Sequence, residues 1–204
     1  MKLYFSRGAC SLAVRIVAHE LNLKLEYEAV NLHGGPTKTT ASGKDYLSIS
    51  PKGNVPVLVL DNGEILTENA VIQQYLADTH PSPMLPPLND FKRYRVLEWL
   101  NFMSSDFHKA FSPLFNPKVP AELKESLFIP VVRMRLDTLN DGLEGRTYLL
   151  GDDFTLPDAY CFVVLRWLPS FNISLADYPN VLSFFQTVSE RPAVKSALEE
   201  ERHN

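Results

Sequence analysis

The N-terminal part of the chain alternates between strand and helix patterns. Residues 2–6 (KLYFS) form a short apolar run, and residues 11–23 place apolar side chains at helical spacing. Residues 24–30 (KLEYEAV) then alternate between apolar and polar, as a half-buried strand does. This order predicts a βαβ unit whose two strands run parallel.

Two further strands and a helix are predicted before residue 81. Residues 55–60 (VPVLVL) and 64–67 (EILT) have strand character, and the DNG sequence between them tolerates the positive φ angles of a tight hairpin. Residues 68–80 return to helical period. The fold class predicted for this part is therefore α/β, a thioredoxin-like domain of the order β-α-β-α-β-β-α.

A proline-rich segment precedes a second part with helical period throughout. Residues 80–90 read HPSPMLPPLND, and prolines spaced this closely cannot continue a helix. Beyond this segment, helical period covers residues 89–116, 120–142, 156–170 and 179–190. The predicted organisation is a thioredoxin-like domain over residues 1–81, a linker over 82–88 and an all-α helical bundle domain over 89–204.

Composition and charge argue against several classes of function. The 204 residues are 45% hydrophobic, enough for a substantial core. The formal net charge is −4, and no basic stripe could neutralise a phosphate backbone. No run reaches the roughly 18 apolar residues of a membrane span, and charged residues interrupt the apolar N-terminal stretch. We therefore expect a cytoplasmic protein without a nucleic-acid or membrane partner.

The chain has two cysteines, Cys10 and Cys161, which form neither a CxxC pair nor a metal-ligand cluster. Neither a disulfide nor a metal site is therefore expected. Cys10 lies where the first strand gives way to the first helix, and the unpaired N–H groups and the helix dipole there favour a negative charge. A thiol in such a position ionises more easily than a free one. Cys10 is thus a candidate reactive thiol, the alternative being a small buried core residue.

Two other turns carry residues suited to binding an extended, zwitterionic molecule. Pro56 at a strand start predicts a cis Val55–Pro56 bond, which would expose the backbone of Val55 to a peptide; the alternative is a trans proline in an edge strand. At the next helix start, Glu68 suits an ammonium group. The N–H groups around Asn69 and the Thr67 hydroxyl suit a carboxylate. The alternative there is simple helix capping.

A polar strip is predicted on the first helix of the second domain. Its residues are spaced four, three and four apart, which places them on one narrow face of an α-helix: Asn101, Ser105, His108 and Ser112. Large apolar residues occupy another face. Such a strip either faces bulk water or lines a wet cleft, and the residues alone leave a structural and a functional role of His108 equally open.

Taken together, these motifs resemble the glutathione S-transferases over the whole chain. GACSLA, SPKGNVP, EWLN and HKAFSPLF are similar to segments of the bacterial beta class, and DDFTLPDAY carries a Thr155–Asp158 capping box expected of the family's sixth helix. The resemblance implies an enzyme that conjugates reduced glutathione, its co-substrate, to hydrophobic electrophiles in detoxification. Glutathione-dependent thiol–disulfide exchange or peroxide reduction would accompany conjugation. The resemblance also implies a homodimer and requires no metal.

The resemblance implies positions for glutathione on the first domain. The cysteinyl backbone would pair with Val55, the γ-glutamyl end would meet Glu68 and Asn69, and Cys10 would face the glutathione sulfur. The glycine end would meet Lys38 or its rival, His33. Many members of the class have Tyr where this chain has Phe5; the alternative thiolate partners left open are Tyr4, Ser6 and notably Ser11.

The second domain would complete the site. Asn101, Ser105 and His108 would close its other wall, with His108 as a hydrogen-bond donor or proton carrier. The electrophile would lie against Phe111, Phe115 and Trp167.

Two alternative functions keep the same fold. In one, Cys10 forms a mixed disulfide with glutathione, and thiol–disulfide exchange or peroxide reduction is the main reaction. In the other, the protein binds ligands without catalysis, although a mere scaffold needs no cysteine at this turn.

Overall fold

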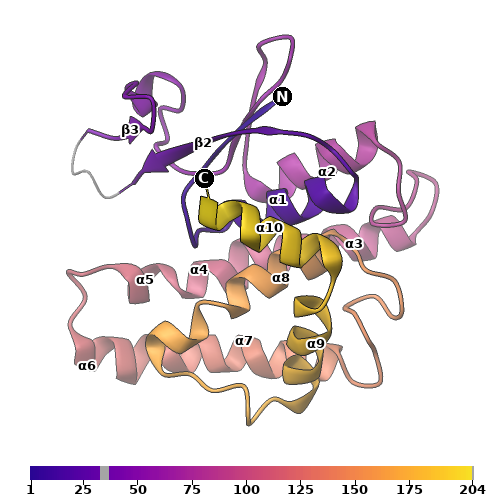
Figure 1. Cartoon of the computed structure of the whole chain (residues 1–204). Helices are drawn as coiled ribbons and strands as arrows, with labels where there is room; N and C mark the ends of the chain where they lie inside the picture. The colour runs from indigo at the N-terminus through magenta and orange to yellow at the C-terminus, as the bar shows by residue number, and fades with distance from the viewer. Residues whose placement is uncertain (33–36, 204) are drawn as a thin grey trace. The chain divides into compact units, whose positions relative to one another are not determined.

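The computed structural model describes residues 1–32 and 37–203, which divide into two compact units (Figure 1). One unit comprises Met1–Ser82 together with Arg191–Asn204, and the other comprises Pro83–Glu190. The sequence-based prediction placed everything after residue 88 in the helical domain. The contacts within the chain instead group the C-terminal segment with the first unit.

The first unit is built on a five-stranded mixed sheet of order β3-β2-β1-β4-β5. Strand β1 pairs in parallel with β2, and β4 is antiparallel to both β1 and β5, so the predicted parallel pair and hairpin are confirmed. The strands are β1 (Lys2–Phe5), β2 (Glu26–Asn31), β3 (Thr39–Thr40), β4 (Val57–Val59) and β5 (Ile65–Thr67). The predicted thioredoxin-like fold class is thereby confirmed.

The connection from β2 to β4 differs from the prediction. In the described part of this connection, residues 37–56, the second helix of the predicted order is only a 3-10 turn, η1 (Tyr46–Ser48), preceded by the two-residue strand β3. Asp45 caps this turn by accepting the N–H of Leu47. Pro51 follows within three residues, and the residue before a proline is disfavoured in helical conformation, so a longer helix does not form.

Helix α1 (Ser11–Glu20) is buried along most of its length because it packs against α2 (Asn69–Thr79) and α10 (Pro192–His203). Figure 1 shows α10 running alongside α1. Buried Arg15 lies over the ring of Tyr27, with its Cζ 3.7 Å from the ring centroid, and pairs with Glu200 of α10 at 3.2 Å. Sequence reasoning missed α10, although Pro192 at its first position is a common helix start.

The second unit is all-helical, as predicted. Its elements are α3 (Lys92–Asn101), η2 (Phe102–Phe107), α4 (His108–Ala110), α5 (Ser112–Phe115), α6 (Ala121–Leu123), η3 (Lys124–Phe128), α7 (Ile129–Gly142), α8 (Leu156–Leu165), η4 (Leu168–Phe171) and α9 (Pro179–Ser189). Segments η2 and η3 are π-helical, and η4 is a 3-10 helix. The apolar face predicted around η2 is confirmed as core by the burial of Leu100, Met103, Phe107, Phe111 and Leu114.

The capping box before α8 is confirmed. Asp158 is completely buried, and one of its carboxylate oxygens accepts the backbone N–H of Thr155 at 2.7 Å and the Thr155 hydroxyl at 2.6 Å. The other oxygen accepts the N–H of Leu149 at 2.8 Å. Asp158 therefore joins the start of α8 to the preceding loop.

Candidate active site

Cys10 and Val55, predicted to share a site, lie in contact in the first unit. Cys10 is the N-cap of α1 and is 7% exposed, and its Sγ donates to the backbone oxygen of Val55 at 3.5 Å. The predicted cis Val55–Pro56 bond is confirmed. A thiol therefore lies at the start of a helix, against the cis-proline turn that precedes β4.

The other cysteine has a different environment. Neither cysteine takes part in a disulfide, and Cys161 is completely buried in α8. Its burial, with the nearby Asp158 carboxylate, raises the pKa of the Cys161 thiol well above its ordinary value. Cys161 thus resembles an inert core residue, since thiolate formation there is suppressed.

The alternative hydroxyl partners have structural contacts of their own. The Ser11 hydroxyl is completely buried, donates to the carbonyl of Ser6 at 3.3 Å and accepts the N–H of Ser6 at 3.3 Å. Tyr4 belongs to the core around Tyr46. Ser11 therefore closes the turn between β1 and α1.

Glu68 has an unusual backbone conformation at the start of α2. Its φ is 70°, a region that residues other than glycine adopt only at some cost and that clusters at functional sites. The Glu68 carboxylate contacts the Lys52 ammonium at 2.7 Å, and Lys52 also donates to the Thr67 hydroxyl at 3.2 Å. Sequence reasoning missed Lys52, although it lies in the SPKGNVP motif. An ammonium group arriving at Glu68 has to share this carboxylate with Lys52.

The side chain of Asn69, the first residue of α2, makes hydrogen bonds with both Cys10 and Gln73. Its side-chain NH₂ group donates to the backbone oxygen of Cys10 at 2.6 Å, and its own oxygen accepts from Gln73 at 2.6 Å. Sequence reasoning considered only the backbone at Asn69 and missed Gln73. No pattern in the chain distinguishes a buried glutamine of this kind from a solvent-facing one.

Lys38 lies beside the loop that leads to Val55. Its ammonium group donates to the backbone oxygen of Gly53 at 2.6 Å. The rival candidate, His33, lies outside the described residues. Lys38 is therefore near the cis-proline turn, where its ammonium group donates one of its three hydrogen bonds to a carbonyl.

In the second unit, the predicted polar strip is interrupted by the π-helical segment η2. Asn101 and Ser105 are exposed, and the Ser105 hydroxyl donates to the carbonyl of Asn101 at 2.9 Å. The wider π-helical turn means that the spacing of Asn101, Ser105 and His108 is no longer that of a single α-helical face. Periodicity does not reveal such segments, which are frequent at functional sites.

His108 is half-buried among aromatic side chains. Its Nδ1 lies 2.7 Å from the Tyr160 hydroxyl, and its ring centroid is 4.8 Å from that of Trp167. Burial, helped by the nearby Lys109 ammonium, lowers the pKa of His108 to about 4. The imidazole is therefore neutral at pH 7, with one ring nitrogen that donates a hydrogen bond and one that accepts a hydrogen bond.

The three predicted apolar residues form one cluster with a fourth. The ring of Trp167 lies 5.6 Å from that of Phe111 and 5.4 Å from that of Phe115. Phe171, which sequence reasoning missed, lies 5.1 Å from Phe115. Phe115 is 53% exposed while Phe111 is completely buried, so the cluster has a core side and a solvent side.

The state of His108 predicts an acid-dependent loss of stability. An unfolded histidine has a pKa of about 6.5. Below that pH this histidine is protonated in the unfolded chain, whereas folded His108 stays neutral until the pH reaches its own lower pKa. Stability therefore falls as the pH falls from about 6.5 toward 4. Between pH 7 and pH 5, denaturant unfolding of the wild type should lose about 2 kcal/mol more than that of His108→Gln. Equal losses in both proteins would contradict this.

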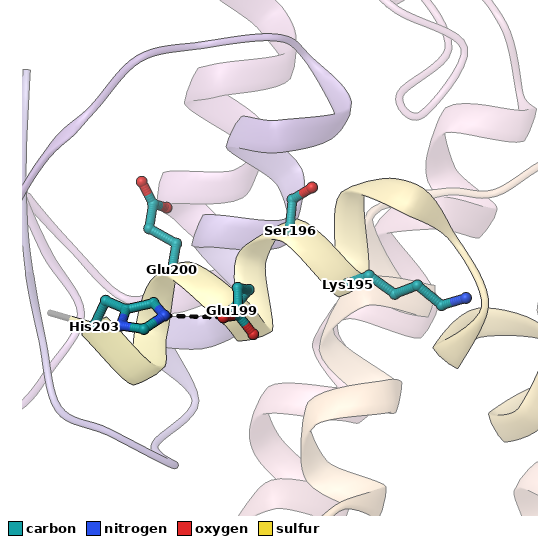
Figure 2. A pocket seen from close by; sticks show the side chains of 5 residues that line it. All are labelled: Lys195, Ser196, Glu199, Glu200 and His203. Carbon is teal, nitrogen blue, oxygen red and sulfur yellow. Dashed lines mark hydrogen bonds and ion pairs between the residues drawn. The ribbon is translucent and has the colours of Figure 1, made fainter.

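Neither a metal site nor a membrane span is found in the described ranges. No group of three or more His, Cys, Asp or Glu side chains there could hold a metal ion, and no helix is both long and apolar enough to cross a membrane. Figure 2 shows a separate open hollow along α10, lined by Lys195, Ser196, Glu199, Glu200 and His203. It contains none of the predicted site residues.

Comparison with known proteins places these features in one family. The N-terminal domain of glutathione S-transferase matches residues 8–79, and its C-terminal domain matches residues 102–192. GstA of Escherichia coli O157:H7 is 40% identical over 206 residues, covering 98% of each chain. A sphingomonad glutathione S-transferase solved with glutathione is 40% identical, with a TM-score of 0.93 and full coverage of both chains. A beta class enzyme of Sphingomonas chungbukensis is 37% identical, with a TM-score of 0.92 over 98% of each chain. The chain belongs to the glutathione S-transferase family.

Proposed function

We propose that the protein conjugates reduced glutathione to hydrophobic electrophiles. The observation that carries this proposal is the contact between the Cys10 thiol and the Val55 carbonyl at the cis-proline turn. The sphingomonad relative was solved with glutathione bound, which supports the same ligand here.

In this proposal glutathione binds along the first unit in an extended conformation. Its cysteinyl backbone pairs with Val55 as an added strand does, which brings its sulfur toward Cys10. Its γ-glutamyl ammonium group meets the Glu68 carboxylate, and its carboxylate meets the N–H groups at the start of α2 near Asn69. Lys38 is the proposed partner of the carboxylate at the glycine end.

The chemistry requires the thiol of glutathione to react as its thiolate. The thiolate sulfur forms a bond to the electrophilic carbon, the leaving group departs with its electron pair, and the thiol proton passes to solvent or a base. Cys10 and the N–H groups at the start of α1 stabilise the negative sulfur. His108 is proposed as a hydrogen-bond donor or proton carrier, and Asn101 and Ser105 are proposed glutathione ligands. The cluster of Phe111, Phe115 and Trp167 is the proposed apolar surface for the electrophile.

A second reaction uses the same thiol. The Cys10 thiolate attacks one sulfur of a glutathione mixed disulfide, which joins glutathione to Cys10 and releases the other thiol as its thiolate. A second glutathione then frees Cys10 and leaves as glutathione disulfide. The position of Cys10 at the start of α1, in contact with the Val55 carbonyl, favours this alternative over a non-catalytic binding protein.

The test measures both reactions in one preparation. Glutathione-dependent turnover by the protein is measured with a chlorinated nitroarene and, in a separate assay, with a mixed disulfide of glutathione and a small thiol. We expect glutathione-dependent turnover of the nitroarene. A folded protein that binds a glutathione resin and gives no such turnover would exclude conjugation, and turnover of the mixed disulfide alone would favour exchange.

We also propose a cytoplasmic homodimer. Apolar side chains are exposed at the start of α3, where Phe91 is 68% and Tyr94 is 58% exposed with their rings 5.9 Å apart. Burying these rings against a second copy removes apolar surface from water. Light scattering should give twice the mass of the chain, and Phe91→Asp should reduce it to that of a monomer. The proposed cytoplasmic location is supported by Cys10 and Cys161, neither of which forms a disulfide, as is usual in a reducing compartment.

A further inference from the structure

A buried chain of hydrogen bonds connects α2 to the start of α1 within the first unit. The Gln73 amide nitrogen donates to the Asn69 side-chain oxygen at 2.6 Å, and the Asn69 amide nitrogen donates to the Cys10 carbonyl at 2.6 Å. Asn69 is 5% exposed and Gln73 is completely buried. The backbone of Cys10 is thus linked to a residue on the second turn of α2.

The chemistry of the groups fixes which one donates and which one accepts in each of these hydrogen bonds. A carbonyl only accepts, so Asn69 must turn its NH₂ group toward Cys10 and its oxygen toward Gln73. Gln73 must then present its own NH₂ group to Asn69. Rotating either amide by 180° would place oxygen against oxygen.

This orientation of the two amides destabilises the far end of the hydrogen-bond series, at Gln73. The side-chain oxygen of Gln73 is buried without a hydrogen-bond partner in the described structure. A buried, unpaired acceptor destabilises the folded state, whereas an apolar side chain of the same length would not. A purely structural glutamine is therefore a poor choice at this position.

The backbone carbonyl of Cys10 has a hydrogen-bond partner even without Asn69 and Gln73. Its carbonyl already accepts the N–H of Ala13 at 3.0 Å, in the first turn of α1. The bond from Asn69 is a second one to the same oxygen. Because the thiol of Cys10 contacts the Val55 carbonyl on its other side, the residue is restrained from two directions.

We propose that Gln73 is a positioning residue that, through Asn69, fixes the direction in which Cys10 presents its thiol. This inference rests on the proposed function, in which Cys10 faces the glutathione sulfur. Gln73 itself touches no substrate. Its effect on the reaction arises because small displacements of a reacting group cost large factors in rate.

The test replaces Gln73 by Met, which has a similar length and no polar atom to leave unpaired. The matched control is Gln74→Met on the same helix, since the Gln74 amide donates to the carbonyl of Ala70, within α2. Three quantities are measured for each variant: the melting temperature, the kcat and KM for glutathione, and the rate at which an aromatic disulfide reagent modifies Cys10 without glutathione.

We expect Gln73→Met to melt within a few degrees of the wild type while its kcat/KM for glutathione falls about tenfold. Cys10 should react faster with the reagent, because its thiol is less tightly held against Val55. Gln74→Met should change neither rate. In an Asn69→Ala background, adding Gln73→Met should cause no further loss of kcat/KM, since both residues act through the same series of hydrogen bonds.

Unchanged Cys10 reactivity and kcat/KM in Gln73→Met would overturn the proposal. So would losses that only follow a lower melting temperature, or losses that add fully to those of Asn69→Ala. If the wild type conjugates no electrophile, the proposed function fails, and Cys10 modification in the free protein still decides the role of Gln73.

Discussion

Replacing Cys10 by Ala is expected to reduce thiol–disulfide exchange by at least about 1,000-fold, because the substitution removes the sulfur that forms the mixed disulfide. Conjugation should fall less, by about 10- to 100-fold, because the substitution removes only one group that stabilises the glutathione thiolate. Initial rates with a glutathione mixed disulfide and with a chlorinated nitroarene measure the two effects.

The control for this experiment is Cys161→Ala, which removes the completely buried thiol of α8. It should lower the melting temperature modestly, because it leaves a small cavity, and should leave both rates close to the wild type. Exchange that survives Cys10→Ala, or that is lost in Cys161→Ala, would show that the reacting thiol is assigned to the wrong residue.

Of the substitutions considered, Asp158→Ala should cause the largest loss of folding stability. Its buried carboxylate accepts hydrogen bonds from Thr155 and from the N–H of Leu149, and the substitution leaves these donors unpaired in the core. We expect the free energy of unfolding to fall by about 3–5 kcal/mol. Denaturant unfolding at pH 7 measures this change.

The exposed neighbour Asp153 provides the matched control. Asp153→Ala should change the free energy of unfolding by no more than about 0.5 kcal/mol, as is usual for surface positions. A loss below about 1 kcal/mol for Asp158→Ala would mean that the capping box does little to stabilise the fold.

Local patterns are sufficient to predict Cys10 as a candidate reactive thiol and the cis bond at Pro56, whereas the meeting of Cys10 and Val55 in one site is implied by the resemblance to the glutathione S-transferases. Cys10 stands out because it lies where the first strand gives way to the first helix. The cis bond followed from a proline at the start of a strand. Each of these inferences uses residues whose backbone restrictions act over a few positions.

Features that depend on tertiary contacts escaped prediction. The ion pair of Lys52 with Glu68 and the buried amide of Gln73 depend on which side chains the fold brings together. The C-terminal helix was missed, and its grouping with the first unit rests on contacts such as that between Arg15 and Glu200. Likewise, the π-helical segment η2 changes the face of a helix without changing its apolar pattern.

The central claim is that Cys10 faces the sulfur of bound glutathione. It is tested most directly by treating the native protein with glutathione disulfide and locating the adduct by peptide mass spectrometry. We predict one glutathionyl group on Cys10 and none on Cys161, whereas both cysteines should react after denaturation. An unmodified Cys10 in the native protein, or an adduct on Cys161 alone, would contradict the claim.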